Sequence, residues 1–186
     1  MNYKYENNTI IEYKPNKFDK KYRYLLRNKG NKTILCICLN PNKANRHISD
    51  RTTKNLEIMA KKNGFDSIAL VNLYPRRSEE VVCLPDKENK CAFKKNLKVI
   101  KKILNDKKIN DVLIATGNDF SKRGYLKEAF KQILDYCLEL INNPSSNKKF
   151  WAIKLTKDNF PMHPSRAPHI VFTTLNIQKL YFDLIK

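Results

Sequence analysis

The apolar run from Ile34 to Leu39 is the sequence feature that most constrains the fold. Six consecutive apolar residues are too few to cross a membrane, and they predict a strand that is buried on both faces of a parallel sheet. The run stops at the polar turn Asn40-Pro41-Asn42-Lys43. Ligands of open α/β sheets bind beyond the carboxyl ends of the strands, so this turn is a candidate site.

Further apolar runs and amphipathic segments alternate along the rest of the chain. Short buried strands are predicted at 68–71, 112–115 and 150–155, and helical periodicity at 53–60, 93–104, 126–141 and 175–185. Asp50 or Thr52 is the expected N-cap of the first helix. The alternation predicts one three-layer α/β domain over residues 1–186, with a central, mostly parallel, four-stranded sheet and helices on both faces.

The segment before the first buried strand predicts an N-terminal hairpin. Residues 22–27 alternate as a strand does, and Asn28-Lys29-Gly30-Asn31 supplies turn chemistry. We expect this hairpin to lead into the strand that begins at Ile34.

The charge balance favours a polyanionic partner. Lysine and arginine number 37 against 18 acidic residues, which gives a net charge of +19 and a pI of about 9.8. Nucleic acid is the first candidate for such a chain. Because 29 of the basic residues are lysines, a general compositional bias toward lysine and asparagine is the alternative explanation.

Several classes of protein are disfavoured by what the sequence lacks. The first six residues contain no apolar signal segment, and no apolar run approaches the length of a membrane helix, so no membrane partner is expected. The five cysteines form no CxxC pair, which indicates reduced core thiols and a cytoplasmic location. With four glycines and no phosphate-binding motif or HExxH motif, we predict no cofactor and no metal. No GxSxG nucleophile elbow is present, which argues against a covalent hydrolase.

Four polar strand ends are predicted to meet at one edge of the sheet: Asn40-Pro41-Asn42, Asn72 with Tyr74, Gly117-Asn118, and His163-Pro164-Ser165. A side-chain amide reads the edge of a nucleobase, an aromatic ring stacks on its face, and a histidine stabilises charge on a departing base. This combination suits recognition of an extrahelical base better than hydrolysis of a small molecule.

Each candidate also has a structural interpretation. His163 is alternatively a structural histidine, Asn72 a turn former or cap, and Asp50 an N-cap rather than a general base. Tyr74 is alternatively a core residue, and the default for Arg76 and Arg77 is solvation rather than phosphate binding.

The motifs resemble a known family in order and spacing. The segments beginning at Leu39, Asp50, Val71, Gly117 and His163 resemble the bacterial domain of unknown function 1643 family, over residues 24–165. More distantly, residues 68–72 and 163–165 are similar to the uracil-DNA glycosylase superfamily. The uracil enzymes place an aspartate before the proline of the first motif, whereas this chain has Asn40, as the mismatch-specific thymine and uracil branch does.

The second resemblance implies a fold and an activity. It implies a uracil-DNA-glycosylase-like sheet and a monofunctional DNA N-glycosylase, a monomer that flips a damaged or modified base out of duplex DNA and hydrolyses its N-glycosidic bond. DNA repair or phage defence is the implied context. A non-catalytic nucleic-acid or nucleotide binding module on the same fold, and a nucleoside or nucleotide N-glycosidase, are the alternatives.

The same resemblance implies roles for individual residues. Asn40 would hold the attacking water, His163 would donate to the base oxygen that gains charge, and Asp50 would be the reserve base. The implied base-binding residues are Pro41, Asn42, Asn72, Tyr74 and Asn118. The implied phosphate-binding residues are Lys43, Arg76, Arg77, Ser165 and Arg166.

Overall fold

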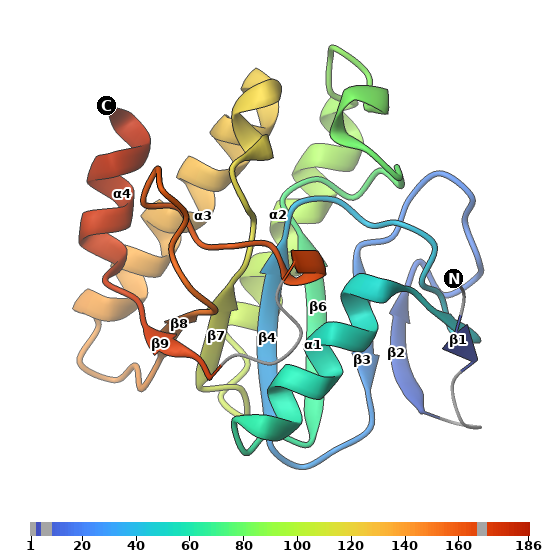
Figure 1. Cartoon of the computed structure of the whole chain (residues 1–186), viewed down its shortest axis with the longest axis horizontal. Coiled ribbons are helices and arrows are strands. Elements are labelled where there is room, and N and C mark those ends of the chain that lie inside the picture. The colour runs from blue at the N-terminus through green and yellow to red at the C-terminus, as the bar shows by residue number, and fades with distance from the viewer. Residues whose placement is uncertain (1–2, 5–8, 167–170) are drawn as a thin grey trace.

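A computed structural model describes residues 3–4, 9–166 and 171–186 of the chain. Within these residues it contains two sheets and four α-helices (Figure 1). The strands are β1 (Tyr3–Lys4), β2 (Ile10–Lys14), β3 (Leu25–Asn28), β4 (Thr33–Cys38), β5 (Ile48–Ser49), β6 (Ser67–Asn72), β7 (Asp111–Ile114), β8 (Lys149–Ala152) and β9 (Thr173–Thr174). The helices are α1 (Arg51–Lys62), α2 (Lys90–Leu104), α3 (Gly124–Asn142) and α4 (Ile177–Ile185). Short 3₁₀ turns are η1 (Val81–Cys83), η2 (Asp119–Lys122) and η3 (Pro164–Arg166).

The main sheet is mixed and has the strand order β2-β3-β6-β4-β7-β8-β9. Its central strands β6, β4, β7 and β8 pair in parallel, and they are the four strands that the apolar runs predict. Every residue of β4 and β6 is buried, as expected for strands that are covered on both faces.

The sheet is wider than predicted, because three antiparallel strands extend the parallel centre. β2 and β3 lie on one side and β9 on the other, so the expected four-stranded sheet is corrected to seven strands. β1 and β5 form a separate antiparallel pair.

The predicted N-terminal hairpin is present, and β2 and β3 form it before the chain enters β4. β3 pairs with β2 and with β6, and β6 separates it from β4. The side chain of Asn28 secures this arrangement, since its Oδ1 accepts a 2.6 Å hydrogen bond from the backbone of Ile68. β4 pairs in parallel with β6 on one edge and with β7 on the other, so β4 has no free edge with which β3 could pair.

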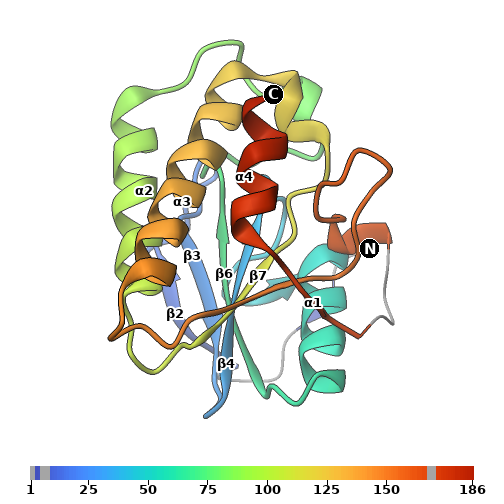
Figure 2. The same cartoon turned by 90° about the vertical axis from the view of Figure 1, so that its left-hand side faces the viewer.

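The two faces of the sheet are covered by different helices (Figure 2). α1 packs against one face, where Ile34, Cys36 and Cys38 of β4 point. α2, α3 and α4 cover the other face, toward which Leu35 and Ile37 point. This alternation along β4 produces the predicted three-layer α/β arrangement.

The cysteines divide into two groups. Cys36, Cys38 and Cys137 are buried, and burial raises the pKa of Cys38 and of Cys137 to about 12, so these thiols are unreactive. Cys83 and Cys91 are exposed, which corrects the expectation that all five are core residues. None of the helices in the described ranges is both long enough and apolar enough to traverse a lipid bilayer.

Candidate functional site

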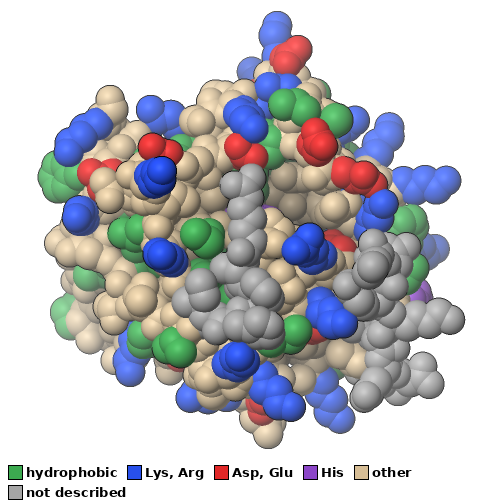
Figure 3. Space-filling model, in the orientation of Figure 1, with side chains coloured by type: hydrophobic (Ala, Val, Ile, Leu, Met, Phe, Trp, Pro, Cys, Tyr) green, Lys and Arg blue, Asp and Glu red, His purple; other side chains and the backbone are tan. Residues whose placement is uncertain are grey.

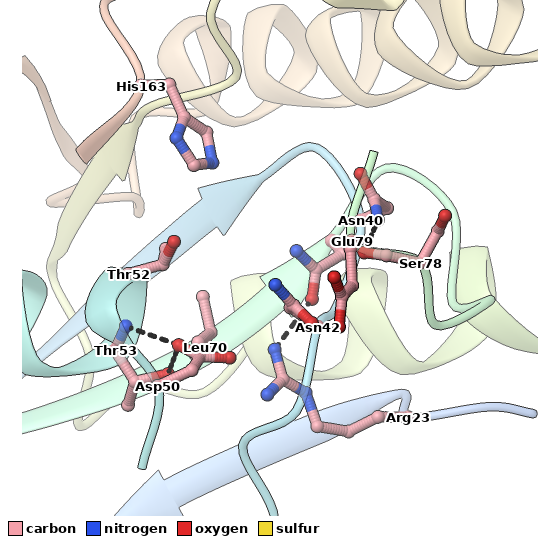
Figure 4. Close-up of a pocket in the computed structure, with 11 residues that line it drawn as sticks. Arg23, Asn40, Asn42, Asp50, Thr52, Thr53, Leu70, Ser78, Glu79 and His163 are labelled. Carbon is pink, nitrogen blue, oxygen red and sulfur yellow. Dashed lines mark hydrogen bonds between the residues drawn. The ribbon is translucent and has the colours of Figure 1, made fainter. Parts of the chain in front are cut away.

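Two adjoining depressions lie at the carboxyl ends of the parallel strands. The inner cavity has a volume of about 60 Å³ and is lined by Arg23, Asn40, Asn42, Asp50, Thr52, Thr53, Leu70, Asn72, Ser78, Glu79 and His163. The outer groove, of about 680 Å³, runs from Leu39 over η1 and the 116–119 and 156–158 segments to Ser165. Asn40, Glu79 and His163 line both. Figure 4 shows His163 on the opposite side of the inner cavity from Asn40.

The floor of the inner cavity is built around a buried arginine. Arg23 is 2% exposed, and its guanidinium donates to the carbonyl of Ala44 at 3.2 Å and to Oδ1 of Asn72 at 3.1 Å. An amide whose oxygen faces a guanidinium cannot flip without opposing two donors. The Asn72 side chain therefore offers its amide nitrogen, a donor, to the rest of the cavity.

Asp50 is also part of the floor and caps α1. Its Oδ1 accepts hydrogen bonds from the backbone and hydroxyl of Thr53, both at 2.9 Å, and its Oδ2 accepts one from the backbone of Ala44 at 3.0 Å. Burial raises the pKa of Asp50, but the nearby Arg23 guanidinium and these hydrogen bonds outweigh burial and leave the pKa below its ordinary value. The N-cap interpretation is confirmed. Both oxygens of the buried Asp50 carboxylate already accept hydrogen bonds from the protein, so Asp50 is less suited than an exposed carboxylate to be a reserve base.

Asn40 and His163, two residues at the rim of the cavity, are predicted from the sequence to be catalytic. Nδ2 of Asn40 donates to the carbonyl of Ser78 at 2.9 Å and to that of Pro41 at 3.3 Å. Because both bonds use the amide nitrogen, the group that Asn40 offers to a ligand is Oδ1, which accepts hydrogen bonds but takes no proton.

His163 has a defined hydrogen-bonding polarity. Its Nδ1 lies 2.9 Å from Oγ of Ser165 and accepts a hydrogen bond from the backbone N–H of Ser165 at 3.3 Å. A neutral imidazole that accepts at Nδ1 carries its proton on Nε2. The ring points into the inner cavity in Figure 4, so His163 is arranged to donate there.

Gly117 allows the His163 segment to approach the end of β7. Gly117 has a φ of +70°, and a Cβ at this position would lie 3.1 Å from Cβ of His163. Its backbone N–H also donates to the carbonyl of Pro161 at 2.8 Å. This close approach brings the third and fourth strand ends together.

Glu79 places a carboxylate beside the first motif. It is exposed at the mouth of both depressions, and its Oε1 lies 2.6 Å from Nζ of Lys43. The hydrogen bond and the charge of Lys43 hold the pKa of Glu79 below its ordinary value. Lys43 is therefore engaged with Glu79 in this structure rather than free for a phosphate.

Tyr74 does not reach the site. It is completely buried, its hydroxyl accepts a hydrogen bond from the backbone of Asn89 at 2.8 Å, and its ring packs against Tyr125. The core interpretation is thus confirmed, and the proposed stacking role is excluded by burial. Neither depression is lined by any aromatic ring from the described residues apart from the His163 imidazole.

Arg77 and Asn118 are occupied elsewhere. The Arg77 guanidinium donates to the carbonyls of Asp19, Asn42 and Ala44 and to the Tyr13 hydroxyl, so it fastens the first motif to the N-terminal segment instead of facing a phosphate. Asn118 lines only the outer groove, where its Nδ2 donates to the carboxylate of Asp158 and its Oδ1 accepts from the Thr156 hydroxyl.

The remaining predicted residues differ in whether they line one of the two depressions. Asn42 lines the inner cavity and Ser165 the outer groove, whereas Pro41 and Arg76 line neither. The side chain of Arg166 lies outside the described part of the structure.

The outer groove is more acidic than the chain as a whole. Its lining includes Glu79, Glu80, Asp119 and Asp158 but only two lysines, Lys122 and Lys157. On the face drawn in Figure 3, most of the visible acidic side chains lie in the upper half, while lysines and arginines are spread over the whole face. The net charge of +19 is therefore not concentrated at the groove. No cluster of His, Cys, Asp and Glu that would hold a metal occurs among the described residues.

Comparison with known proteins places the chain in a family. A family described as "Protein of unknown function (DUF1643)" matches residues 23–165, and these bounds run from Arg23 of the floor to Ser165 beside His163. The chain belongs to this family. The resemblance read from the motif order is thereby confirmed. No curated protein and no solved structure matches the chain.

Two residues of the site escaped prediction from the family-like motifs. Arg23 begins the region shared with the DUF1643 family, and the only signal for it was a charged residue directly before the apolar Tyr24-Leu25-Leu26. Glu79 lies in the connection between Arg76 and Ala92, which has no periodicity that would place it. Tertiary structure alone brings Glu79 beside Asn40.

Proposed function

We propose that the protein is a DNA-glycosylase-like enzyme that binds DNA, flips out a damaged or modified base and hydrolyses its N-glycosidic bond. The observation that carries this proposal is that Asn40, Asn72 and His163, which follow or end three different strands, line one cavity. Such convergence at the carboxyl ends of parallel strands is typical of ligand sites in α/β proteins.

The fold supports the proposal in a second way. β4 carries the first motif and lies between β6, which ends in Asn72, and β7, which ends before Gly117. We take this layout of a parallel centre with the motifs at its carboxyl edge as similar to that of the uracil-DNA glycosylases.

The polarity of the cavity favours a base that bears carbonyl oxygens. Asn72 offers its amide N–H₂ because Arg23 holds its oxygen, and His163 offers Nε2–H because Ser165 holds Nδ1. Two donors complement two acceptors, and an exocyclic amine in either place would leave donors opposed. We therefore expect a keto base such as uracil, thymine or hypoxanthine, or a derivative of one, to be preferred over cytosine or adenine.

The proposed reaction assigns a task to each group on the rim. A water held by Oδ1 of Asn40 attacks the sugar carbon as the bond from that carbon to the base nitrogen breaks. The bonding electron pair passes to the base, where Nε2–H of His163 stabilises the charge on a carbonyl oxygen. The attacking water loses its proton to the Glu79 carboxylate, since Asn40 cannot accept it.

A non-catalytic binding module is the second candidate. The amide at Asn40 and the lining without an aromatic ring, His163 aside, favour it, because excision enzymes use both an activated water and a stacked base. Such a module would use the same cavity for binding.

An excision assay separates the two candidates. The wild-type protein is incubated with duplexes that each contain one uracil, mismatched thymine, hypoxanthine, alkylated base or hydroxymethylated base, and abasic sites are scored. We expect abasic sites with at least one keto base, from duplex DNA and not from free nucleosides. Tight binding to one of these duplexes without any base release would support the binding module instead, and release from free nucleosides alone would support a nucleosidase.

A further inference from the structure

The outer face of α2 carries a row of lysines. All six lysines of this helix are exposed, and four of them, Lys90, Lys94, Lys98 and Lys102, recur at four-residue intervals. Side chains with this spacing follow one another along one side of a helix, about 6 Å apart and over about 18 Å in total. We call these four residues the lysine row.

The other two lysines of α2 are held against neighbouring aromatic rings. Nζ of Lys95 lies 4.9 Å from the ring centroid of Tyr24, and Nζ of Lys101 lies 4.6 Å from that of Tyr136. These contacts hold two of the positive charges close to the protein surface on either side of the row. None of the ion pairs found among the described residues involves a lysine of α2.

The neighbouring helix shows that the row is not a simple product of composition. α3 covers the same face of the sheet, yet it contains two lysines and three acidic residues, and Lys131 pairs with Asp135 at 3.0 Å. α2 contains no acidic residue at all. Like charges four residues apart destabilise a helix, so the lysine row is unfavourable unless an anion neutralises it.

The surroundings of the row identify the kind of anion. A helix that binds a membrane surface needs exposed apolar side chains that enter the lipid. The exposed large apolar side chains of the described residues are on other elements, and none belongs to α2. A regular row of point charges with no apolar flank suits a phosphate backbone, which presents a regular series of negative charges.

We propose that the lysine row binds the phosphate backbone of duplex DNA. The row lies on the opposite side of the sheet from α1, whose N-terminus lines the inner cavity. It is therefore a second contact surface, and it is independent of the sequence of the DNA. The choice of DNA rests on the proposed function, whereas the contact with a phosphate backbone rests on the lysine row alone.

The test compares two charge-matched variants of the full chain. One replaces all four residues of the lysine row by glutamine, which preserves helix propensity. The control replaces four exposed lysines on other elements, Lys20, Lys61, Lys127 and Lys179, and so has the same net charge. Affinity for a short unmodified duplex is measured by fluorescence anisotropy between about 50 and 200 mM salt.

The lysine-row variant should lose at least about tenfold in affinity at low salt, and the slope of log K against log salt should become shallower by about 3 to 4. The control should keep the wild-type slope, and a variant with arginine at the four row positions should keep it too. An equal loss of duplex affinity in both glutamine variants, or no loss of affinity in either, would overturn the proposal. Unchanged DNA affinity combined with lost binding to phosphatidylserine vesicles would overturn it in favour of a membrane surface. Circular dichroism checks that the lysine-row variant is folded.

Discussion

The floor and the rim of the inner cavity differ in burial and in hydrogen bonding. On the floor, Arg23, Asp50 and Asn72 are buried, and they are joined by hydrogen bonds and by charge. On the rim, Lys43 and Glu79 are exposed and form an ion pair with each other. The floor is thus a buried, hydrogen-bonded unit that fixes the polarity of the cavity, whereas Lys43 and Glu79 on the rim are open to solvent. Substitutions in the two regions should have opposite consequences for stability and activity.

Substitution of Asp50 by alanine should have the largest effect on stability. It removes the N-cap of α1, which typically costs about 0.5 to 2 kcal/mol, and it leaves the buried backbone N–H of Ala44 without its acceptor, which costs about 1 to 3 kcal/mol. We expect the free energy of unfolding, measured by urea titration at pH 7, to fall by about 3 kcal/mol.

Asn89→Ala is the matched control, because Asn89 caps α2 with no buried arginine beside it and should cost about 1 kcal/mol. Since the pKa of Asp50 is lowered in the folded state, its stabilisation is present above the ordinary carboxylate pKa and is lost as the pH falls through the folded value. Equal losses of the free energy of unfolding in the Asp50 and Asn89 variants would show that Asp50 stabilises the protein only as an N-cap.

Substitution of Glu79 by glutamine should show the opposite behaviour. Glu79 is exposed, so the unfolding transition should stay where it is in the wild type, while base release should slow by about 100-fold because the proton acceptor is lost. Single-turnover base release on the best substrate measures this. Glu80→Gln is the control, since Glu80 lines only the outer groove. If the wild type is active and the Glu79 variant is equally active, the assignment of the base is wrong but the proposed function stands.

Substitution of Glu57 by glutamine should stabilise the protein at neutral pH. Burial raises the pKa of Glu57 to about 7, although the hydrogen bond from Asn28 opposes the shift. The folded state then binds more protons than the unfolded state between about pH 4.5 and 7, so stability decreases as the pH rises through this window. Glutamine removes this loss, and we expect a gain of about 2 kcal/mol at pH 8 and almost none at pH 4.

The exposed Glu139→Gln variant on α3 is the control for Glu57, and its stability should not change between the two pH values. A Glu57 variant that is no more stable than the wild type at pH 8 would contradict this prediction. It would show that ionisation of Glu57 does not destabilise the folded state.

Substitution of Lys43 by methionine should have the smallest effect. The Lys43 ammonium holds the pKa of Glu79 down, so its removal raises that pKa. A base must be ionised to act, and activity is lost as the pH falls through its pKa. The acid limb of the kcat/KM profile should therefore move to higher pH in the variant, with little change at pH 8. An acid limb that does not move would show that the ionisation of Glu79 does not control the reaction.

Local patterns in the sequence predicted the parallel centre of the sheet, all four helices and five of the residues that line the inner cavity, Asn40, Asn42, Asp50, Asn72 and His163. Apolar runs and helical periodicity are local signals, and Asp50 is an N-cap because capping is decided within a few residues. Long-range contacts were beyond such reasoning. The pairing of β3 with β6 and the burial of Tyr74 beneath Asn89 depend on segments that are far apart or have no periodicity. Arg23 and Glu79 join the site for the same reason.

The central claim is that His163 stabilises a departing base in the inner cavity. The most direct test measures base release and duplex affinity together in His163→Ala, with His47→Ala, at an exposed histidine outside both depressions, as the control. Loss of one charge-stabilising donor typically slows such a reaction by about 100-fold or more. We predict that loss of base release for the His163 variant with duplex affinity unchanged, and wild-type behaviour for the control. Undiminished base release by the His163 variant would contradict the account.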